Sequence, residues 1–219
     1  MASLRLLAAA PLLSVAALLG TASLLGACQS EPAPASPDAA LRAVEGTPPP
    51  DAALAARVLA RVAEVDSLRI ARAATIPPGA DVTAETFAEV CQPVGRRIRE
   101  VAETEGWEFR QVAVRNRNPA NAASAEDARL HARFEAEPAL QGLWLEADRD
   151  GQRGHRYVQR ITMQATCAAC HGARDERPDF VLERYPEDRA YGFATGGLRG
   201  LYSVFVPASV FAPASLAGE

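Results

Sequence analysis

The chain has 219 residues, a formal net charge of −4 and 48% hydrophobic residues. None of its basic residues is Lys, and its Arg residues form neither a basic patch nor a basic helix. This balance argues against nucleic acid as a partner. The length suits one domain of ordinary size with a sizeable hydrophobic core.

The N-terminus has the pattern of an export signal. Residues 2–27 contain a single charge, Arg5, followed by a long apolar run rich in Leu and Ala. The run ends in Leu-Gly-Ala directly before Cys28, which resembles a bacterial lipobox and predicts cleavage before Cys28 and a lipid anchor on its thiol. The alternatives are an ordinary signal peptide or an uncleaved membrane anchor. We expect a lipoprotein on the periplasmic side of a bacterial membrane, and Gln after the Cys favours the outer membrane.

This leader gives a three-part organisation. Residues 1–27 form the signal peptide, and residues 28–50 are rich in Pro, Ala, Ser and Glu with almost no large apolar side chain. That composition is typical of a disordered tether. Residues 51–219 then form the single folded domain.

Helices come first in this domain. Apolar residues at helical spacing predict a helix over residues 51–74, ended by Pro77-Pro78-Gly79. A second helix is predicted over residues 83–103, with Thr83 as its N-cap. Pro93 falls inside this second helix and should kink it beside Cys91. The stripe of the first helix consists of Leu54, Val58, Val62, Val65 and Leu68.

Short strands follow. The pattern predicts strands over residues 107–115, 143–147, 156–161 and 201–206, with a helix over residues 124–137 between the first two. A polar loop fills residues 116–121, and a Gly-rich hairpin loop fills residues 148–154. Helices followed by short antiparallel strands indicate an α+β fold, with the N-terminal helices packed on the sheet and a cofactor held between them.

The segment Cys167-Ala168-Ala169-Cys170-His171 carries the chemistry. Cys-x-x-Cys-His is the attachment pattern of c-type haem, because two thiols at this spacing add to the two vinyl groups of one porphyrin. The adjacent His171 then binds iron from the proximal side. Zinc is the alternative, but a structural zinc site usually draws on a second Cys/His pair at short spacing, which this chain lacks. The motif therefore predicts one covalent haem c.

One cysteine has no assigned partner. Lipid takes Cys28 and haem takes the motif cysteines, which leaves Cys91 in an oxidising compartment. It is either a buried inert thiol or the second axial ligand of the iron. The other candidates are Met163, close to the motif in sequence, His131, expected to be solvated on its helix, and His155, expected in an exposed loop.

Five ordered motifs resemble a known family. They are the isolated Cys in a helix, Gly-Trp before a strand with Arg117-Asn118-Pro119-Ala120-Asn121 after it, the haem motif, Tyr185-Pro186-x-Asp188-x-Ala190-x-Gly192, and Gly200-x-Tyr202-Ser203-Val204. Over residues 50–208 the chain resembles the c-type haem family once catalogued only as a domain of unknown function. Its members are stand-alone exported proteins or sensor regions of histidine kinases and chemoreceptors. The resemblance implies a PAS-like fold and axial ligation by His171 and Cys91.

The chain departs from this family at two positions. Members often carry Ser and Lys shortly before Arg-Asn-Pro, where this chain has Ala113 and Arg115. The charge is kept but a hydroxyl is lost. Asn118 is expected to act as a turn clamp. Arg117 is either part of the same clamp or a contact to the haem propionates, for which Arg is suited.

A thiolate ligand favours ferric iron and a low reduction potential. Two protein ligands leave no open position for a substrate, so we expect no enzyme. We expect a redox or diatomic-gas sensing module that could bind CO or NO in the ferrous state and would signal through a partner protein. The alternative is a low-potential electron-transfer cytochrome.

Overall fold

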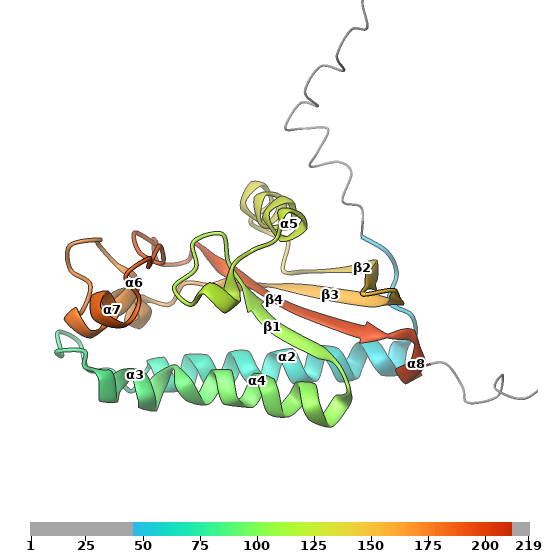
Figure 1. Cartoon of the computed structure of the whole chain (residues 1–219), viewed down its shortest axis with the longest axis horizontal. Coiled ribbons are helices and arrows are strands. Elements are labelled where there is room, and N and C mark those ends of the chain that lie inside the picture. The colour runs from blue at the N-terminus through green and yellow to red at the C-terminus, as the bar shows by residue number, and fades with distance from the viewer. Residues whose placement is uncertain (1–45, 212–219) are drawn as a thin grey trace, which may run out of the picture. The chain divides into compact units, whose positions relative to one another are not determined.

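The computed structural model describes residues 46–211, and the predicted leader, Cys28 and most of the tether lie outside them. The elements are a run of helices, a four-stranded sheet, and short helices between the last two strands (Figure 1). In chain order they are α2 (Ala52–Ala73), α3 (Ala84–Val90), α4 (Gln92–Glu105), β1 (Glu108–Val112), η1 (Pro119–Asn121), α5 (Ala125–Ala136), β2 (Gly142–Arg149), β3 (Gln152–Thr162), η2 (Ala165–Cys167), α6 (Ala168–His171), α7 (Asp179–Arg184), β4 (Leu198–Pro207) and α8 (Ala208–Phe211).

Helix α2 forms as its sequence predicts. The Asp51 side chain accepts a hydrogen bond from the backbone N–H of Leu54 at 2.7 Å, which satisfies one of the free donors of the first turn. The residues at helical spacing lie on one face and are buried, namely Leu54, Val58, Val62 and Val65. The helix is therefore fixed by both a local cap and an apolar stripe.

The predicted helix over residues 83–103 is two helices that meet at Cys91. Thr83 caps α3 as expected, in a capping box with Thr86. Cys91 is both the C-cap of α3 and the N-cap of α4, and Pro93 lies in the first turn of α4, where its missing N–H costs no helical hydrogen bond. The predicted kink is thus a complete break, and the break is where the chain presents Cys91.

The sheet has the strand order β1-β4-β3-β2, and every neighbouring pair is antiparallel. β2 and β3 are joined by Asp150 and Gly151, whose φ angles of 54° and 79° are both positive. This is the geometry of a tight hairpin turn that suits Asp-Gly. The predicted loop over residues 148–154 was therefore too long, because most of it pairs in the sheet.

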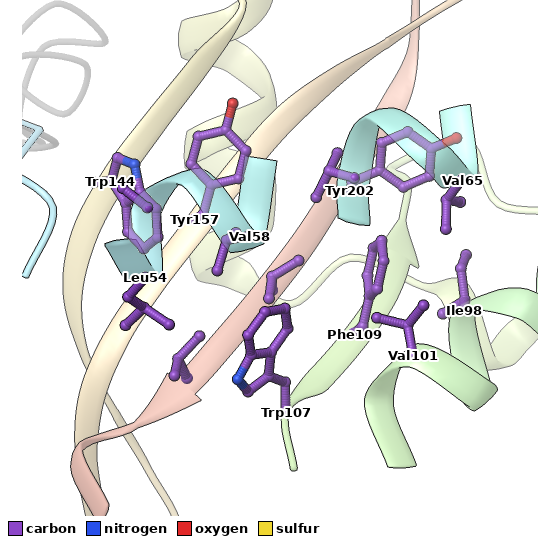
Figure 2. Packing of buried hydrophobic residues seen from close by; sticks show 14 of the residues in the cluster. Leu54, Val58, Val65, Ile98, Val101, Trp107, Phe109, Trp144, Tyr157 and Tyr202 are labelled. Atoms are coloured by element: carbon purple, nitrogen blue, oxygen red, sulfur yellow. The ribbon is translucent and has the colours of Figure 1, made fainter. Parts of the chain in front are cut away.

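Helices cover both faces of the sheet (Figure 1). α2 and α4 pack on one face, where their apolar side chains meet Trp107, Phe109, Trp144, Tyr157 and Tyr202 (Figure 2). α5 packs on the other face through Leu130 and Phe134. Ser124 caps α5 in a capping box with Asp127. The fold is the predicted PAS-like α+β fold, with an antiparallel sheet and N-terminal helices against it.

A long connection links the two central strands. β3 ends at Thr162 and β4 begins at Leu198, and the residues between them hold the Cys-x-x-Cys-His motif and α7. Connections of this length in a small domain are usually functional. Among residues 46–211, no helix has the length and hydropathy needed to cross a membrane.

Candidate haem-binding site

A cavity of about 490 Å³ lies at the end of the sheet where β1 and β3 finish and β4 starts. Its lining comes from α2, the α3–α4 junction, the sheet end, and the connection between β3 and β4. The five residues predicted for haem binding in the folded domain all line it: Cys91, Arg117, Cys167, Cys170 and His171. The fold thus brings residues far apart in sequence to one cavity.

The attachment motif lies on two short helical turns. Cys167 ends η2, and Cys170 and His171 belong to α6. Residues three apart on a helical turn lie on the same side, so both thiols are presented together. Cys91, Cys167 and Cys170 form no disulfide and are free thiols.

His171 is held by one ring nitrogen. Its Nδ1 lies 2.6 Å from the carbonyl oxygen of Ala190. A carbonyl only accepts, so Nδ1 carries the proton and donates it. Burial, followed by the charges of Arg199 and Arg117, holds the pKa of His171 well below its usual value, so the ring is neutral. Nε2 therefore keeps a free lone pair, which is the arrangement found in metal-binding histidines.

Arg117 is a clamp across three segments. Its Nε donates to the Asp188 carboxylate at 3.2 Å, and one terminal nitrogen donates to the backbone oxygen of Cys170 at 2.6 Å. The same nitrogen lies 3.4 Å from the oxygen of Ala190. Asn118 accepts a hydrogen bond from Ala120 N–H at 3.0 Å, which confirms the predicted turn clamp. The contact between Arg117 and a propionate stays a prediction.

Asp188 closes this network. Its carboxylate also accepts from Arg177 at 3.1 Å and from the backbone N–H of Ala190 at 2.9 Å. Burial opposes the charged form, but the Ala190 hydrogen bond and Arg117 outweigh it and lower the pKa of Asp188. The motif Tyr-Pro-x-Asp-x-Ala is therefore the support of His171, because its Ala190 positions the ring and its Asp188 positions Arg117.

Cys91 enters the cavity from the α3–α4 junction. Solvent reaches it through the open cavity, but protein atoms of the cavity walls surround it and reduce its hydration. Burial, with smaller contributions from the thiols of Cys170 and Cys167, raises the pKa of Cys91 to about 11. The thiol is therefore protonated at neutral pH in the absence of a metal and would release its proton on coordination.

The other candidate ligands are separated by the fold. Met163 lines the cavity but is buried against Ala190 and Phe193, beside the attachment motif. His131 was expected to be solvated and is instead buried on α5. His155 was expected in an exposed loop and is instead a half-buried residue of β3 whose ring packs near Phe211. Neither histidine lines the cavity.

The two departures from the family pattern have clear positions. Ala113 lines the cavity, and its backbone N–H and oxygen bond to residues 121 and 123. The Arg115 guanidinium lies 3.7 Å from the centre of the Phe193 ring and donates to the oxygen of Tyr191 at 2.9 Å. The Arg115 side chain thus holds the segment after Asp188 in place.

Sequence reasoning missed the strong positive charge of the cavity. Six arginines line it, and none of the lining residues in the described part of the chain is Asp or Glu. These arginines are Arg69, Arg96, Arg99, Arg117, Arg184 and Arg199. They come from five different segments of the chain, so no run of basic residues in the sequence marks them.

These residues suit haem as a ligand. The volume falls within the range of cofactor sites, about 300–1,000 Å³. The cavity offers free thiols, a neutral histidine with one free nitrogen, and guanidinium groups for carboxylates. Within residues 46–211, no three His, Cys, Asp or Glu side chains are grouped to hold a bare metal ion.

The fold and the site define a haem-binding α+β protein, and comparison with known proteins agrees. The chain belongs to the Tll0287-like family, whose profile matches residues 43–207. It is similar to the crystal structure of the cyanobacterial haem protein Tll0287, with 40% sequence identity and a TM-score of 0.65. That match covers 72% of this chain and 97% of the other. No curated protein matches the chain.

Proposed function

We propose that the chain carries one haem c, bound through thioethers to Cys167 and Cys170, with His171 and Cys91 as axial ligands of the iron. The observation that carries this proposal is the meeting of all four side chains in one cavity, with His171 oriented by Ala190 so that only Nε2 remains free. Haem supplies a reversible one-electron change and, when an axial position opens, a binding site for CO or NO.

The role we propose is redox or diatomic-gas sensing, without turnover of a substrate. Cys91 is the exchangeable ligand in this proposal, because the short helix before it is thinly packed. Of the residues of α3, only Val90 is buried. Protonation of the Cys91 sulfur would favour its release, and the α3–α4 junction would then move. A partner protein would read this movement.

The deciding experiment compares optical spectra of the ferric and ferrous protein, with and without CO, for the parent and for Cys91→Ala. In the sensor, the ferrous parent binds CO slowly after losing Cys91, and Cys91→Ala binds it fast and has a raised reduction potential. Glu89→Ala, an exposed change in α3, should behave like the parent.

The other outcomes of this experiment are equally specific. Identical axial ligands in both redox states, with fast electron exchange and no CO binding, would identify an electron-transfer cytochrome instead. An unchanged spectrum in Cys91→Ala would reduce Cys91 to a packed thiol, and Met163 would be the next ligand to test, since it also lines the cavity.

We also propose that Cys28 carries a lipid that anchors the domain on the periplasmic side of a bacterial membrane. The lipobox-like sequence before Cys28 supports it. Globomycin, which inhibits the lipoprotein signal peptidase, should cause the uncut precursor to accumulate, and Cys28→Ser should abolish fatty-acid labelling. Processing of Cys28→Ser to a soluble protein of normal size would show an ordinary signal peptide.

A further inference from the structure

Among the six cavity arginines, Arg96 and Arg99 are the two whose side chains make no ion pair, hydrogen bond or ring contact with the residues that the structure describes. Both are exposed. The arginine between them on α4 behaves differently: Arg97 binds Glu64 at 2.6 Å and Glu100 at 3.1 Å, and does not line the cavity. The helix therefore turns two free guanidinium groups toward the cavity and pairs the third elsewhere.

The other four arginines that line the cavity each have a contact, although among the described residues only Arg69 and Arg117 are paired with a carboxylate. Arg69 is paired with Asp66, and Arg117 with Asp188. Arg199 donates to the Arg115 oxygen at 3.2 Å. Arg184 lies over the Phe87 and Tyr185 rings. The charge of Arg117 is already paired with Asp188, and its Nε and one terminal nitrogen already donate, so only its second terminal nitrogen is left for a propionate.

The local shape of α4 favours a flat ligand carrying carboxylates. Gly95 also lines the cavity, and a Cβ at this position would meet only the Arg99 guanidinium, at 3.8 Å. The Arg99 side chain thus bends back along the helix toward Cys91, as long helical side chains do. From Cys91 to Arg96 and Arg99 the helix rises by about 7.5 and 12 Å, at about 1.5 Å per residue.

The structure of the porphyrin indicates which wall of the cavity the propionates face. Its two propionates lie on the edge away from the two vinyl groups. If Cys167 and Cys170 hold the vinyl edge, the carboxylates point away from η2 and α6, toward another wall of the cavity. The α4 wall carries Arg96 and Arg99, whose guanidinium groups make no other contact, and a guanidinium fork matches a carboxylate with two hydrogen bonds.

We propose that Arg96 and Arg99, and not Arg117, bind the haem propionates. This inference rests on the proposed attachment of haem at Cys167 and Cys170. The pair neutralises the two carboxylates, lowers their pKa, and places positive charge near the iron. Arg96 and Arg99 would thus recognise the propionate edge of the haem, while the other residues of the site hold the iron and the vinyl edge.

The test uses the full haem-loaded protein with Arg96→Gln/Arg99→Gln, and haem labelled with ¹³C at its two carboxyl carbons. Two readouts are followed against pH: the carboxyl ¹³C shifts and the reduction potential. The expected result is a higher carboxyl pKa and a lower potential than in the parent. In the double variant the reduction potential should also begin to change at a higher pH than in the parent, because its haem carboxylates take up protons at a higher pH.

The matched control is Arg97→Gln, which removes the same charge from the same helix. If the haem carboxyl groups titrate in Arg96→Gln/Arg99→Gln as they do in Arg97→Gln, the inference is wrong. It is also wrong if the double variant loses only the binding of an anionic partner protein and the carboxyl pKa values stay at those of the parent. Arg96→Lys/Arg99→Lys keeps the charges and should restore part of the effect, which guards against misfolding of the Gln variant. Lack of covalent haem in the parent would overturn the proposed function itself and would be seen beforehand by acid–acetone extraction.

Discussion

The two sides of the cavity that would hold the iron are built in opposite ways. His171 is backed by a buried network, in which Ala190 fixes its ring and the ion pair of Arg117 and Asp188 fixes the surrounding backbone. Cys91 stands at a break between two helices, without a side-chain hydrogen bond at the N-terminus of α4. The helix before it buries one side chain, while α4 after it buries Val94, Ile98 and Val101.

The difference between the surroundings of His171 and Cys91 indicates which of the two iron ligands can dissociate. A buried network of charge-assisted hydrogen bonds resists displacement, since each unpaired member would be costly. A junction with little buried apolar surface opens at low free-energy cost. We therefore expect His171 to remain bound in both redox states and Cys91 to exchange. The variants below test this comparison, starting with the largest expected effect.

Removing both attachment thiols should have the largest effect. Cys167→Ser/Cys170→Ser should leave no covalently bound haem, because both thioether bonds are lost. Acid–acetone extraction measures it: the parent should keep its colour in the protein, and so should Cys91→Ala, which changes the other side of the cavity. Extraction of the colour from the parent into the organic phase would contradict covalent attachment.

Breaking the buried network should destabilise the His171 side strongly. The Asp188 side chain is fully buried and that of Arg117 is 8% exposed. Asp188→Ala should lower the free energy of unfolding by about 3–5 kcal/mol, since it leaves a buried cation unpaired. Urea denaturation measures this, with the exposed neighbour Glu187→Ala as the control. A loss no larger than that of the control would mean that the network does not support this side.

The same pair should give a pH-dependent stability. Burial raises the pKa of Asp188, but the hydrogen bond from Ala190 and the Arg117 charge lower it further, so its folded pKa lies below its unfolded one. Its contribution is then fully present above the unfolded pKa and is lost as pH falls through the folded pKa. The stability difference between parent and Asp188→Ala should therefore shrink on acidification. A constant difference from pH 7 down to about pH 2 would exclude Asp188 as the source.

The smallest change in stability is expected when the N-caps of α3 and α5 are removed. Thr83 and Ser124 each form a capping box, at α3 and α5. Ser124→Ala should lower global stability by about 1 kcal/mol, because α5 is packed on the sheet. Thr83→Ala should instead speed hydrogen exchange in α3 with little global change, since we expect α3, which buries only Val90, to open separately. An equal global loss in both variants would show that α3 is as firmly integrated as α5.

Locally encoded features were predictable from the sequence. Thr83 was recognisable as a cap, and the attachment motif is a short local pattern that the fold brings to the cavity. The family motifs indicated the right segments. They did not tell whether Arg117 faces a propionate or Asp188, because that ion pair joins residues 71 positions apart and depends on the whole connection between β3 and β4.

Long-range packing explains what was missed. His131 looked solvated because the predicted apolar stripe of its helix ran through Leu130 and Phe134 and left His131 beside it, but in the fold α5 buries His131 as well. The strands of the β2–β3 hairpin were predicted too short, because the glycines near the turn were interpreted as part of a loop. In the structure only Asp150 and Gly151 form the turn. The positive charge of the cavity came from separate segments that only the tertiary fold assembles.

A haem attached at Cys167 and coordinated by Cys91 would close a loop of the chain that contains α4, β1, α5, β2 and β3. Cys91 and Cys167 are then tied to the same group across 76 positions of the chain. Such a closure removes conformational freedom from the unfolded chain, and for a covalent link of this span the loop-closure relation gives about 4.5 kcal/mol. Release of Cys91 would open the loop and leave only the local attachment at η2 and α6. The oxidised and reduced proteins would then differ in resistance to unfolding as well as in colour, and a partner could recognise that difference in rigidity.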